Sequence, residues 1–182
     1  GISAETLVKN IDKKVTKHDT LVILGDVGNI EYVKQLKAGY KVLIMGNHDN
    51  GASNYQKNYN NKLFDEVYEG QLTIRKNIVL SHEPVNFPFA LNIHGHDHSG
   101  TDFKNYVLID YDADMDSQDM TKNYLEVIKA NKLTKFNVCA EWIGSMPVSL
   151  KTILQSGILK NIDDIHRIAI DRAKDHKDCK KY

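Results

Sequence analysis

Three histidines fall within five residues in the stretch His94-Gly95-His96-Asp97-His98, in a chain of 182 residues that has eight histidines in all. Imidazole is the commonest side-chain ligand of metals in proteins, so such a cluster suggests a metal site. A single buried histidine is more often a hydrogen-bonded core residue than a ligand. Taken alone, the stretch is compatible with two ions, with one ion or with none.

Four segments that read as strands end in residues of the types that bind metals. Side chains at the carboxyl ends of strands converge in open α/β sheets, and a preceding glycine lets the backbone turn sharply there. Each motif is weak by itself, but four in succession indicate one shared metal site. The motifs are Gly25-Asp26, Gly46-Asn47-His48-Asp49, Ser81-His82-Glu83-Pro84 and Gly95-His96-Asp97-His98.

The elements that must position these residues alternate between helices and short apolar strands in the first half of the chain. A helix is predicted over residues 4–15, where apolar residues recur at helical spacing after Ser3, a residue that suits an N-cap. A second helical stretch covers residues 30–36. Residues 20–26 and 40–49 are almost wholly apolar before their polar ends, which is typical of strands buried on both faces. This alternation predicts an α/β fold.

The second half of the chain continues with further strands and helices and shows no linker, so we expect one domain over residues 1–182 with a polar tail at 175–182. The last helix would bury one face that carries Ile162, Ile165, Ile168 and Ala169. The predicted elements are a hairpin over 71–84 that turns near Lys76-Asn77, strands over 89–98, 105–112 and 135–142, an acidic segment that becomes helical over 113–134, and a helix from Ser149 to about Lys174.

The ordered motifs "GD", "GNHD", "H" and "GHDH" resemble those of the calcineurin-like metallophosphoesterase family, in its small cytosolic phosphodiesterase and phosphatase branch. The stretch "FNVCAEWIGSMPVSLKTIL" is similar to the segment that closes the domain in small members. The resemblance covers most of the chain. It implies a four-layer α/β/β/α sandwich, whose first strand this sequence does not show.

The resemblance also implies two divalent metal ions, which clamp a phosphate and activate a bridging hydroxide as the nucleophile. Asp26 would bridge both ions and His98 would bind the first ion. The second ion would be bound by Asn47, His82 and His96. His48 would stabilise the charge of the transition state and protonate the leaving oxygen, and Asp49 would hold the His48 imidazole. Oxygen and imidazole ligands suit Mn, Fe or Zn. The implied metal ligands are Asp26, Asn47, His82, His96 and His98. His94 is interpreted as a packing residue.

The family's first ion also takes ligands from an Asp-x-His motif at the end of a first strand, which is not visible before residue 4. His18-Asp19 has the reverse order, and Asp164-Ile165-His166 fits a helix better than a strand end. Two interpretations remain open. Either a strand with this motif precedes Gly1, which we favour, or the first metal site is reduced and the chain is a weakened single-metal enzyme or a binding module.

The expected function is metal-dependent hydrolysis of small phosphoesters by a phosphodiesterase or phosphatase. Lys plus Arg and Asp plus Glu number 24 each, so the formal charge of zero argues against nucleic acid as a partner. No apolar run is long enough to cross a membrane, and Cys139 and Cys179 lack metal or redox spacing, so we expect no membrane partner, reduced cysteines and a cytoplasmic location.

Three other features are interpreted as structural. Asp110, Asp112, Asp114 and Asp116 alternate, but the turn glycine and the final glutamate of a calcium loop are missing, so a solvated loop is expected. Residues 54–61 read as a surface loop. Trp142 and Met146 are expected to pack in the core or at its edge.

Overall fold

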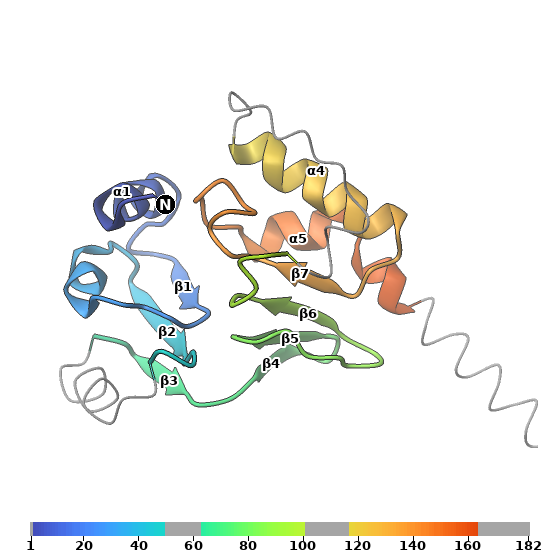
Figure 1. Cartoon of the computed structure of the whole chain (residues 1–182), viewed down its shortest axis with the longest axis horizontal. Coiled ribbons are helices and arrows are strands. Elements are labelled where there is room, and N and C mark those ends of the chain that lie inside the picture. Colours follow the sequence, from blue (N-terminus) through green and yellow to red (C-terminus); the bar gives the residue numbers. More distant parts are fainter. Residues whose placement is uncertain (1, 50–62, 101–116, 164–182) are drawn as a thin grey trace, which may run out of the picture.

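Two β-sheets and the helices beside them carry the strand ends that the sequence marks out (Figure 1). The computed structural model describes residues 2–49, 63–100 and 117–163. Over these ranges the chain is a mixed α/β protein, as the alternation of elements predicts. None of the helices in the described ranges is long and apolar enough to cross a membrane.

The first sheet contains three parallel strands, β1 (Thr20–Ile23), β2 (Tyr40–Ile44) and β3 (Glu66–Tyr68), which lie in this spatial order. The α-helix α1 (Ala4–Lys14) precedes β1, and the 3-10 helix η1 (Ile30–Gln35) connects β1 to β2. Both helices and the sheet share one apolar cluster. Its members include Val15, Leu21, Val33, Leu36, Leu43 and Phe64.

Helix α1 begins as predicted. The hydroxyl of Ser3 accepts the backbone N–H of Thr6, which satisfies one of the free donors at the start of the helix. The apolar residues Val8 and Ile11 pack against the sheet, whereas no residue of the helix is fully buried. The helix is therefore amphipathic, with its apolar side on the sheet.

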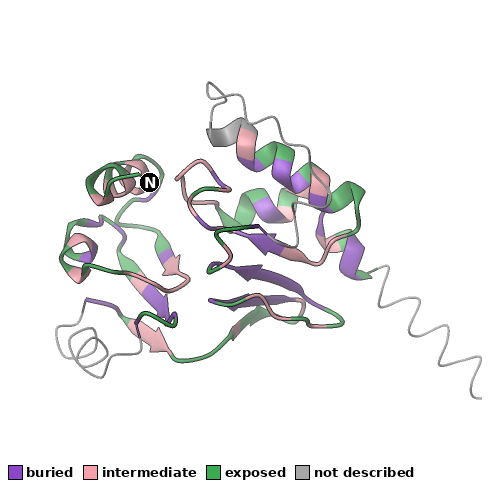
Figure 2. Ribbon diagram, viewed as in Figure 1, coloured by how far each residue is buried: buried purple, intermediate pink, exposed green. Residues whose placement is uncertain are grey.

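The second sheet contains four strands in the spatial order β4-β5-β6-β7. Strands β4 (Leu72–Arg75) and β5 (Ile78–Ser81) are antiparallel and form the predicted hairpin around Lys76-Asn77. Strands β6 (Leu91–His94) and β7 (Lys135–Asn137) continue the sheet in parallel with β5. Every residue of β5 and β6 is buried, so these strands form the buried centre of the second sheet (Figure 2).

Two α-helices pack against the second sheet, α4 (Ser117–Ala130) and α5 (Leu150–Ser156). The helix predicted to run from Ser149 to about Lys174 is interrupted, because Gly157 takes a left-handed conformation (φ 80°) that ends α5. Helical backbone resumes at Leu159. The shared core cluster includes Ile78, Leu91, Ile93, Tyr124, Ile128, Phe136, Ile153, Ile158 and Ile162.

Strand β1 differs from its expected environment. Its sequence reads as a strand buried on both faces, but only Leu21 is buried, while Thr20 is exposed and the other two residues are half-buried. The reason is topological, because β1 lies at the edge of its sheet and pairs only with β2 among the described residues.

Several expectations concern residues outside the described ranges. These are the strand at 105–112, the aspartates 110–116, the loop 54–61, the motif 164–166, Ile165, Ile168, Ala169, Cys179 and the tail 175–182. That residues 1–182 form one domain stays a prediction. Trp142 and Met146 are half-buried, and Trp142 packs against the main core cluster, as expected of packing residues.

Candidate metal centre

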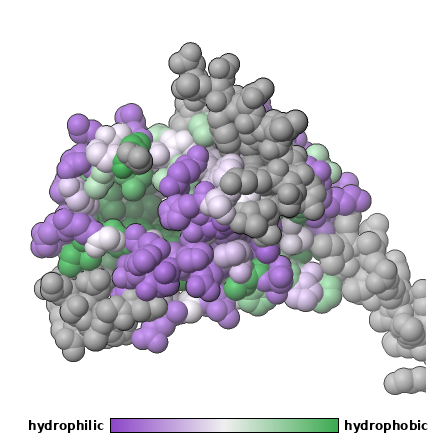
Figure 3. Space-filling view, in the orientation of Figure 1, coloured by the Kyte–Doolittle hydropathy of each residue, from purple (hydrophilic) through white to green (hydrophobic). Residues whose placement is uncertain are grey.

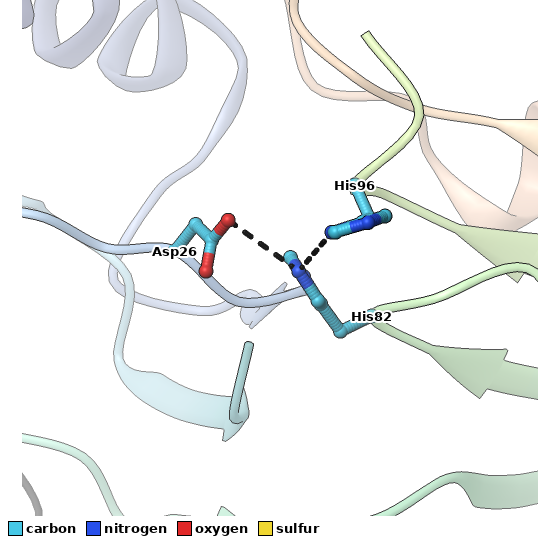
Figure 4. A group of neighbouring side chains, drawn as sticks. All are labelled: Asp26, His82 and His96. Atoms are coloured by element: carbon cyan, nitrogen blue, oxygen red, sulfur yellow. Dashed lines mark hydrogen bonds and ion pairs between the residues drawn. The ribbon is translucent and has the colours of Figure 1, made fainter. Parts of the chain in front are cut away.

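Four strands from the two sheets deliver one polar side chain each to the same place. Asp26 follows β1, Asn47 follows β2, His82 comes directly after β5, and His96 lies two residues after β6. The sequence predicts these four residues as ligands, and the structure brings them together. Figure 4 shows three of them, with Asp26 and His96 on either side of the His82 ring.

The Nε2 atom of His82 is the centre of this group. It lies 2.9 Å from Oδ1 of Asn47, 3.0 Å from Nδ1 of His96 and 3.4 Å from Oδ2 of Asp26. Nδ1 of His96 is also 3.1 Å from Oδ1 of Asn47. The rings of His82 and His96 meet edge to face, with centroids 4.8 Å apart.

The other nitrogen of His82 determines what Nε2 can do. Nδ1 lies 2.7 Å from the backbone carbonyl oxygen of Leu24, which can only accept a hydrogen bond, so Nδ1 carries a proton and donates it. In the neutral imidazole Nε2 then presents a lone pair. The same use of the remote nitrogen is common among histidines that bind metals.

Electron-pair donors therefore face one another without enough protons between them. His82 Nε2, Asn47 Oδ1 and Asp26 Oδ2 are all acceptors, and His96 Nδ1 can supply at most one proton. A divalent cation would satisfy all four atoms at once. In a tetrahedral site with bonds of about 2.0–2.1 Å, ligand atoms lie about 3.3–3.4 Å apart, close to the separations seen here. The donor set thus fits one ion of the Mn, Fe or Zn type.

The backbone is shaped to bring these atoms together. Asp26 and His96 both have positive φ, 53° and 62°, a conformation that is uncommon for residues other than glycine and is often retained at functional sites. Gly25 and Gly46 leave room for the His82 ring. A Cβ on Gly25 would collide with Nδ1 of His82, and a Cβ on Gly46 would lie 2.7 Å from Cε1 of the same ring.

Asp49 has a role that differs from the expected one. Its carboxylate is buried and accepts three backbone N–H groups, from Asp26 at 2.7 Å, Val27 at 3.0 Å and Gly46 at 2.9 Å. No hydrogen bond joins it to the His48 imidazole. Asp49 instead ties the loop after β1 to the loop after β2, so it positions the ligands.

His48 lies next to the ligand Asn47 and is exposed. Its backbone N–H donates to Oδ1 of Asp26 at 3.0 Å, which fixes one carboxylate oxygen while Oδ2 faces His82. The imidazole makes no hydrogen bond to the described part of the chain. It is therefore free to meet a molecule that approaches the group from solvent.

His98 does not join the Asp26 group. Its Nδ1 lies 2.9 Å from Oε1 of Glu141, and together with Cys139 these residues form a second group whose potential ligand atoms lie within 4.8 Å of one another. Burial acts to raise the pKa of Glu141, but a backbone hydrogen bond and His98 lower it more, so the pKa lies below its ordinary value. Burial and nearby carboxylates raise the pKa of the Cys139 thiol to about 12, so a proton occupies the sulfur at neutral pH.

Two buried asparagines support the ligand loops and were missed in the sequence. Asn137 donates to the carbonyl of Asp97 at 2.6 Å and thereby holds the loop that carries His96. Asn92 contacts Ser81 and accepts the N–H of Val85, which holds the segment around His82. The only available signal was an asparagine inside an apolar strand. Glu141 and Cys139 carried no spacing signal, because His98 lies about forty residues before them.

His94 packs as interpreted. It is buried, at 2% exposure, and its Nδ1 lies 2.8 Å from the carbonyl oxygen of Gly95.

Comparisons with protein-family models, with curated proteins and with solved structures found no match. The function proposed next therefore depends on the residues and geometry of this chain.

Proposed function

We propose that Asp26, Asn47, His82 and His96 bind a divalent metal ion and that the protein is a metal-dependent hydrolase of small phosphoesters, related to the calcineurin-like metallophosphoesterases. One observation carries the proposal. Nε2 of His82 lies 2.9 Å from Oδ1 of Asn47 and 3.4 Å from Oδ2 of Asp26, and with a neutral ring that keeps its proton on Nδ1 all three atoms are acceptors, an arrangement that a cation would stabilise.

Bound divalent ions at this place would supply Lewis-acid stabilisation of a phosphate and a lowered pKa for water. Side chains of the protein would orient the ion and act on the phosphate. Asp26 would offer Oδ2 to the ion, because its Oδ1 accepts the backbone N–H of His48. Asn47 would offer its single side-chain oxygen. The exposed His48 imidazole would stabilise the charge that develops on the phosphate and protonate the leaving oxygen.

The arrangement of the elements supports a relation to the four-layer α/β/β/α sandwich. Helices α1 and η1 pack on the first sheet, and α4 and α5 pack on the second sheet. Ile44 of the first sheet belongs to the same core cluster as the second sheet, a contact that a sandwich with both sheets between the helices would explain.

Activity is tested with bis-p-nitrophenyl phosphate and added manganese, iron or zinc, on the polypeptide as its gene encodes it. We expect turnover that disappears with a chelator and returns with metal. His48→Ala should lose at least about 100-fold in turnover but keep its metal. The control is His18→Ala, which alters an exposed histidine before β1, away from the group. A protein with bound metal but no turnover with any metal refutes the hydrolase proposal.

A second candidate function is a binding module or weakened enzyme with a single ion. The separation of His98 from the Asp26 group favours it, because His98 lies with Glu141 and Cys139 instead of sharing an ion with Asp26. Metal analysis distinguishes the two candidates. Two ions per chain favour the dinuclear hydrolase, and one ion without turnover favours the module.

A further inference from the structure

Three side chains of the types that bind metals meet outside the Asp26 group, on the loops that follow β6 and β7. His98 comes from the first loop, whereas Cys139 and Glu141 come from the second. One potential ligand atom of each residue lies within 4.8 Å of the other two, and Nδ1 of His98 is 2.9 Å from Oε1 of Glu141. A nitrogen, a sulfur and an oxygen donor thus lie together at the carboxyl ends of two neighbouring parallel strands.

Two contacts hold these loops to each other. The side chain of Asn137 donates from Nδ2 to the carbonyl oxygen of Asp97 at 2.6 Å, and its Oδ1 accepts the backbone N–H of Cys139 at 2.9 Å. One buried amide therefore ties both loops together. Gly100 provides the second contact, because a Cβ there would lie 2.2 Å from Cζ2 of Trp142. The backbone that carries the three donors is held in place without a ligand.

The surroundings of Cys139 favour a cation. The residue is buried, and after burial the charges of Glu141, Asp97 and Asp26 raise the pKa of the thiol. These carboxylates make the electrostatic potential negative at this place, which attracts a divalent ion. A bound ion also reverses the effect on the thiol, because a coordinated sulfur gives up its proton.

The group is accessible from solvent. The side chains of His98 and Glu141 are 69% and 56% exposed, and both residues line an apolar cavity of about 930 Å³ together with Cys139. Figure 3 shows this cavity as a hydrophobic hollow beside α1, bordered by hydrophilic residues. Ligand atoms of a tetrahedral zinc site with one sulfur lie about 3.3–3.6 Å apart, so exposed side chains would need to move by only about 1 Å to close around an ion.

We propose that His98, Cys139 and Glu141 bind a zinc ion at a site separate from the Asp26 group, with water as the fourth ligand. Imidazole, thiolate and carboxylate are the ligand types that zinc takes in proteins. The sulfur distinguishes this site from the Asp26 group, which offers only oxygen and nitrogen. The ligand set also differs from the one that the resemblance implies for His98, since neither Cys139 nor Glu141 is among those ligands. The inference does not depend on the proposed hydrolysis.

An ion pair at the surface is the simpler alternative. It would account for the contact between His98 and Glu141, because a protonated imidazole donates to a carboxylate. An ion pair needs neither a buried sulfur at its side nor an amide that joins the two loops. A metal site needs both, since its ligands must be held close to the positions that the ion requires.

Titration of the whole polypeptide with Co²⁺ tests the proposal, because Co²⁺ replaces zinc and gives an intense charge-transfer band in the near ultraviolet when a thiolate binds it. We expect this band to disappear in Cys139→Ser and to remain in His82→Ala, which alters only the Asp26 group. Glu141→Gln should weaken the binding that the band reports by at least about 10-fold. Cys179→Ser is the matched control, because it removes the other cysteine of the chain and should keep the band.

Absence of the band overturns the proposal, as does a band that persists in Cys139→Ser or disappears in Cys179→Ser. Should Cys139→Ser fail to fold, His98→Ala and Glu141→Gln decide, since both alter exposed side chains; unchanged Co²⁺ affinity in both shows an ion pair only and overturns the site.

The zinc content of the purified protein provides a second measurement. It should fall by one ion per chain in Cys139→Ser, and an equal content in both proteins overturns the proposal. Because this ion adds to the total, the count that separates a dinuclear hydrolase from a binding module is made on Cys139→Ser. Turnover is measured separately, so either proposal can fail alone.

Discussion

The Nδ1 atom of His82 lies 2.7 Å from the backbone carbonyl oxygen of Leu24. This contact joins the end of β5 to the end of β1 and so connects the two sheets. It also directs the lone pair of Nε2 toward Asn47, His96 and Asp26. A single backbone oxygen thereby selects the tautomer and the orientation of the ring at the centre of the candidate metal centre.

Replacing His82 by Ala should weaken binding of a divalent ion by at least about 10-fold, because the ring is the central ligand of the group. Titration with Co²⁺, followed by its visible absorption, measures the affinity directly. His18→Ala is the matched control, since it removes an exposed imidazole that contacts none of the four ligands. Equal affinities for the two variants would contradict the assignment of His82.

Replacing Asp49 by Asn should destabilise the fold. The buried carboxylate accepts three backbone N–H groups, whereas the amide of Asn provides one acceptor oxygen and an NH₂ group that clashes with a donor. The expected loss is about 3 kcal/mol in the free energy of unfolding, measured by urea denaturation.

The control for Asp49 is Asp65→Asn. Asp65 is exposed and accepts one backbone N–H, from Lys41, so its replacement should cost less than about 1 kcal/mol. If Asp49→Asn is no more costly than this control, the three hydrogen bonds do not hold the two loops. If Asp49→Asn instead leaves stability intact but lowers turnover, the originally expected role beside His48 is the better one.

Replacing Gly46 by Ala should reduce the affinity for a divalent ion, because it disturbs two of the proposed ligands. The new methyl would collide with the Asp26 carboxylate and lie 2.7 Å from Cε1 of His82, so both ligands must move. We expect an affinity lower by about 10-fold or more in calorimetric titration. Gly70→Ala is the matched control, because a Cβ there meets nothing within 4 Å. Unchanged affinity in the Gly46 variant would show that the loops after β1 and β2 can accommodate the methyl group without moving the ligands.

The thiol of Cys139 should resist alkylation in the native protein. Burial, followed by the charges of Glu141, Asp97 and Asp26, raises its pKa from 9.0 to about 12. At pH 8 the folded protein then holds about 1,000-fold less thiolate than a free cysteine would. Iodoacetamide labelling of Cys139, followed by mass spectrometry of the peptide, should be slow in native protein and fast in urea.

The same pKa shift predicts a pH dependence of stability. The folded state keeps the Cys139 proton while the unfolded state loses it above pH 9, so the stabilising contribution is complete below pH 9 and is lost as the pH rises toward 12. Cys139→Ala should reduce the fall in thermal stability between pH 9 and pH 11. An identical fall in both proteins would show that the thiol does not contribute.

Local signals in the sequence predicted those features that short-range interactions determine. Ser3 marks the start of α1, the Lys76-Asn77 turn marks the hairpin, and glycines mark the strand ends that carry Asp26 and His96. The end of α5 at Gly157 carried a signal too, because glycine commonly ends helices, but the apolar pattern that continues beyond it favoured one long helix.

Long-range contacts could not be predicted in the same way. Asp49 lies next to His48 in the sequence, yet its carboxylate turns back to backbone groups more than twenty residues earlier. His98 meets Glu141 across 43 residues. The exposure of β1 depends on which strand lies beside it, and an apolar stretch does not reveal its neighbours.

The four ligands of the candidate centre divide into two pairs along the chain. Asp26 and Asn47 follow the first sheet, His82 and His96 follow the second, and between β3 and β4 the polypeptide passes only through Glu69, Gly70 and Gln71, all exposed. An ion bound here would therefore act as a removable cross-link between two sequence-contiguous halves, comparable to a disulfide that closes a long loop. A chain divided at Gly70 would give two fragments, and their reassembly would serve as a sensor for the metal.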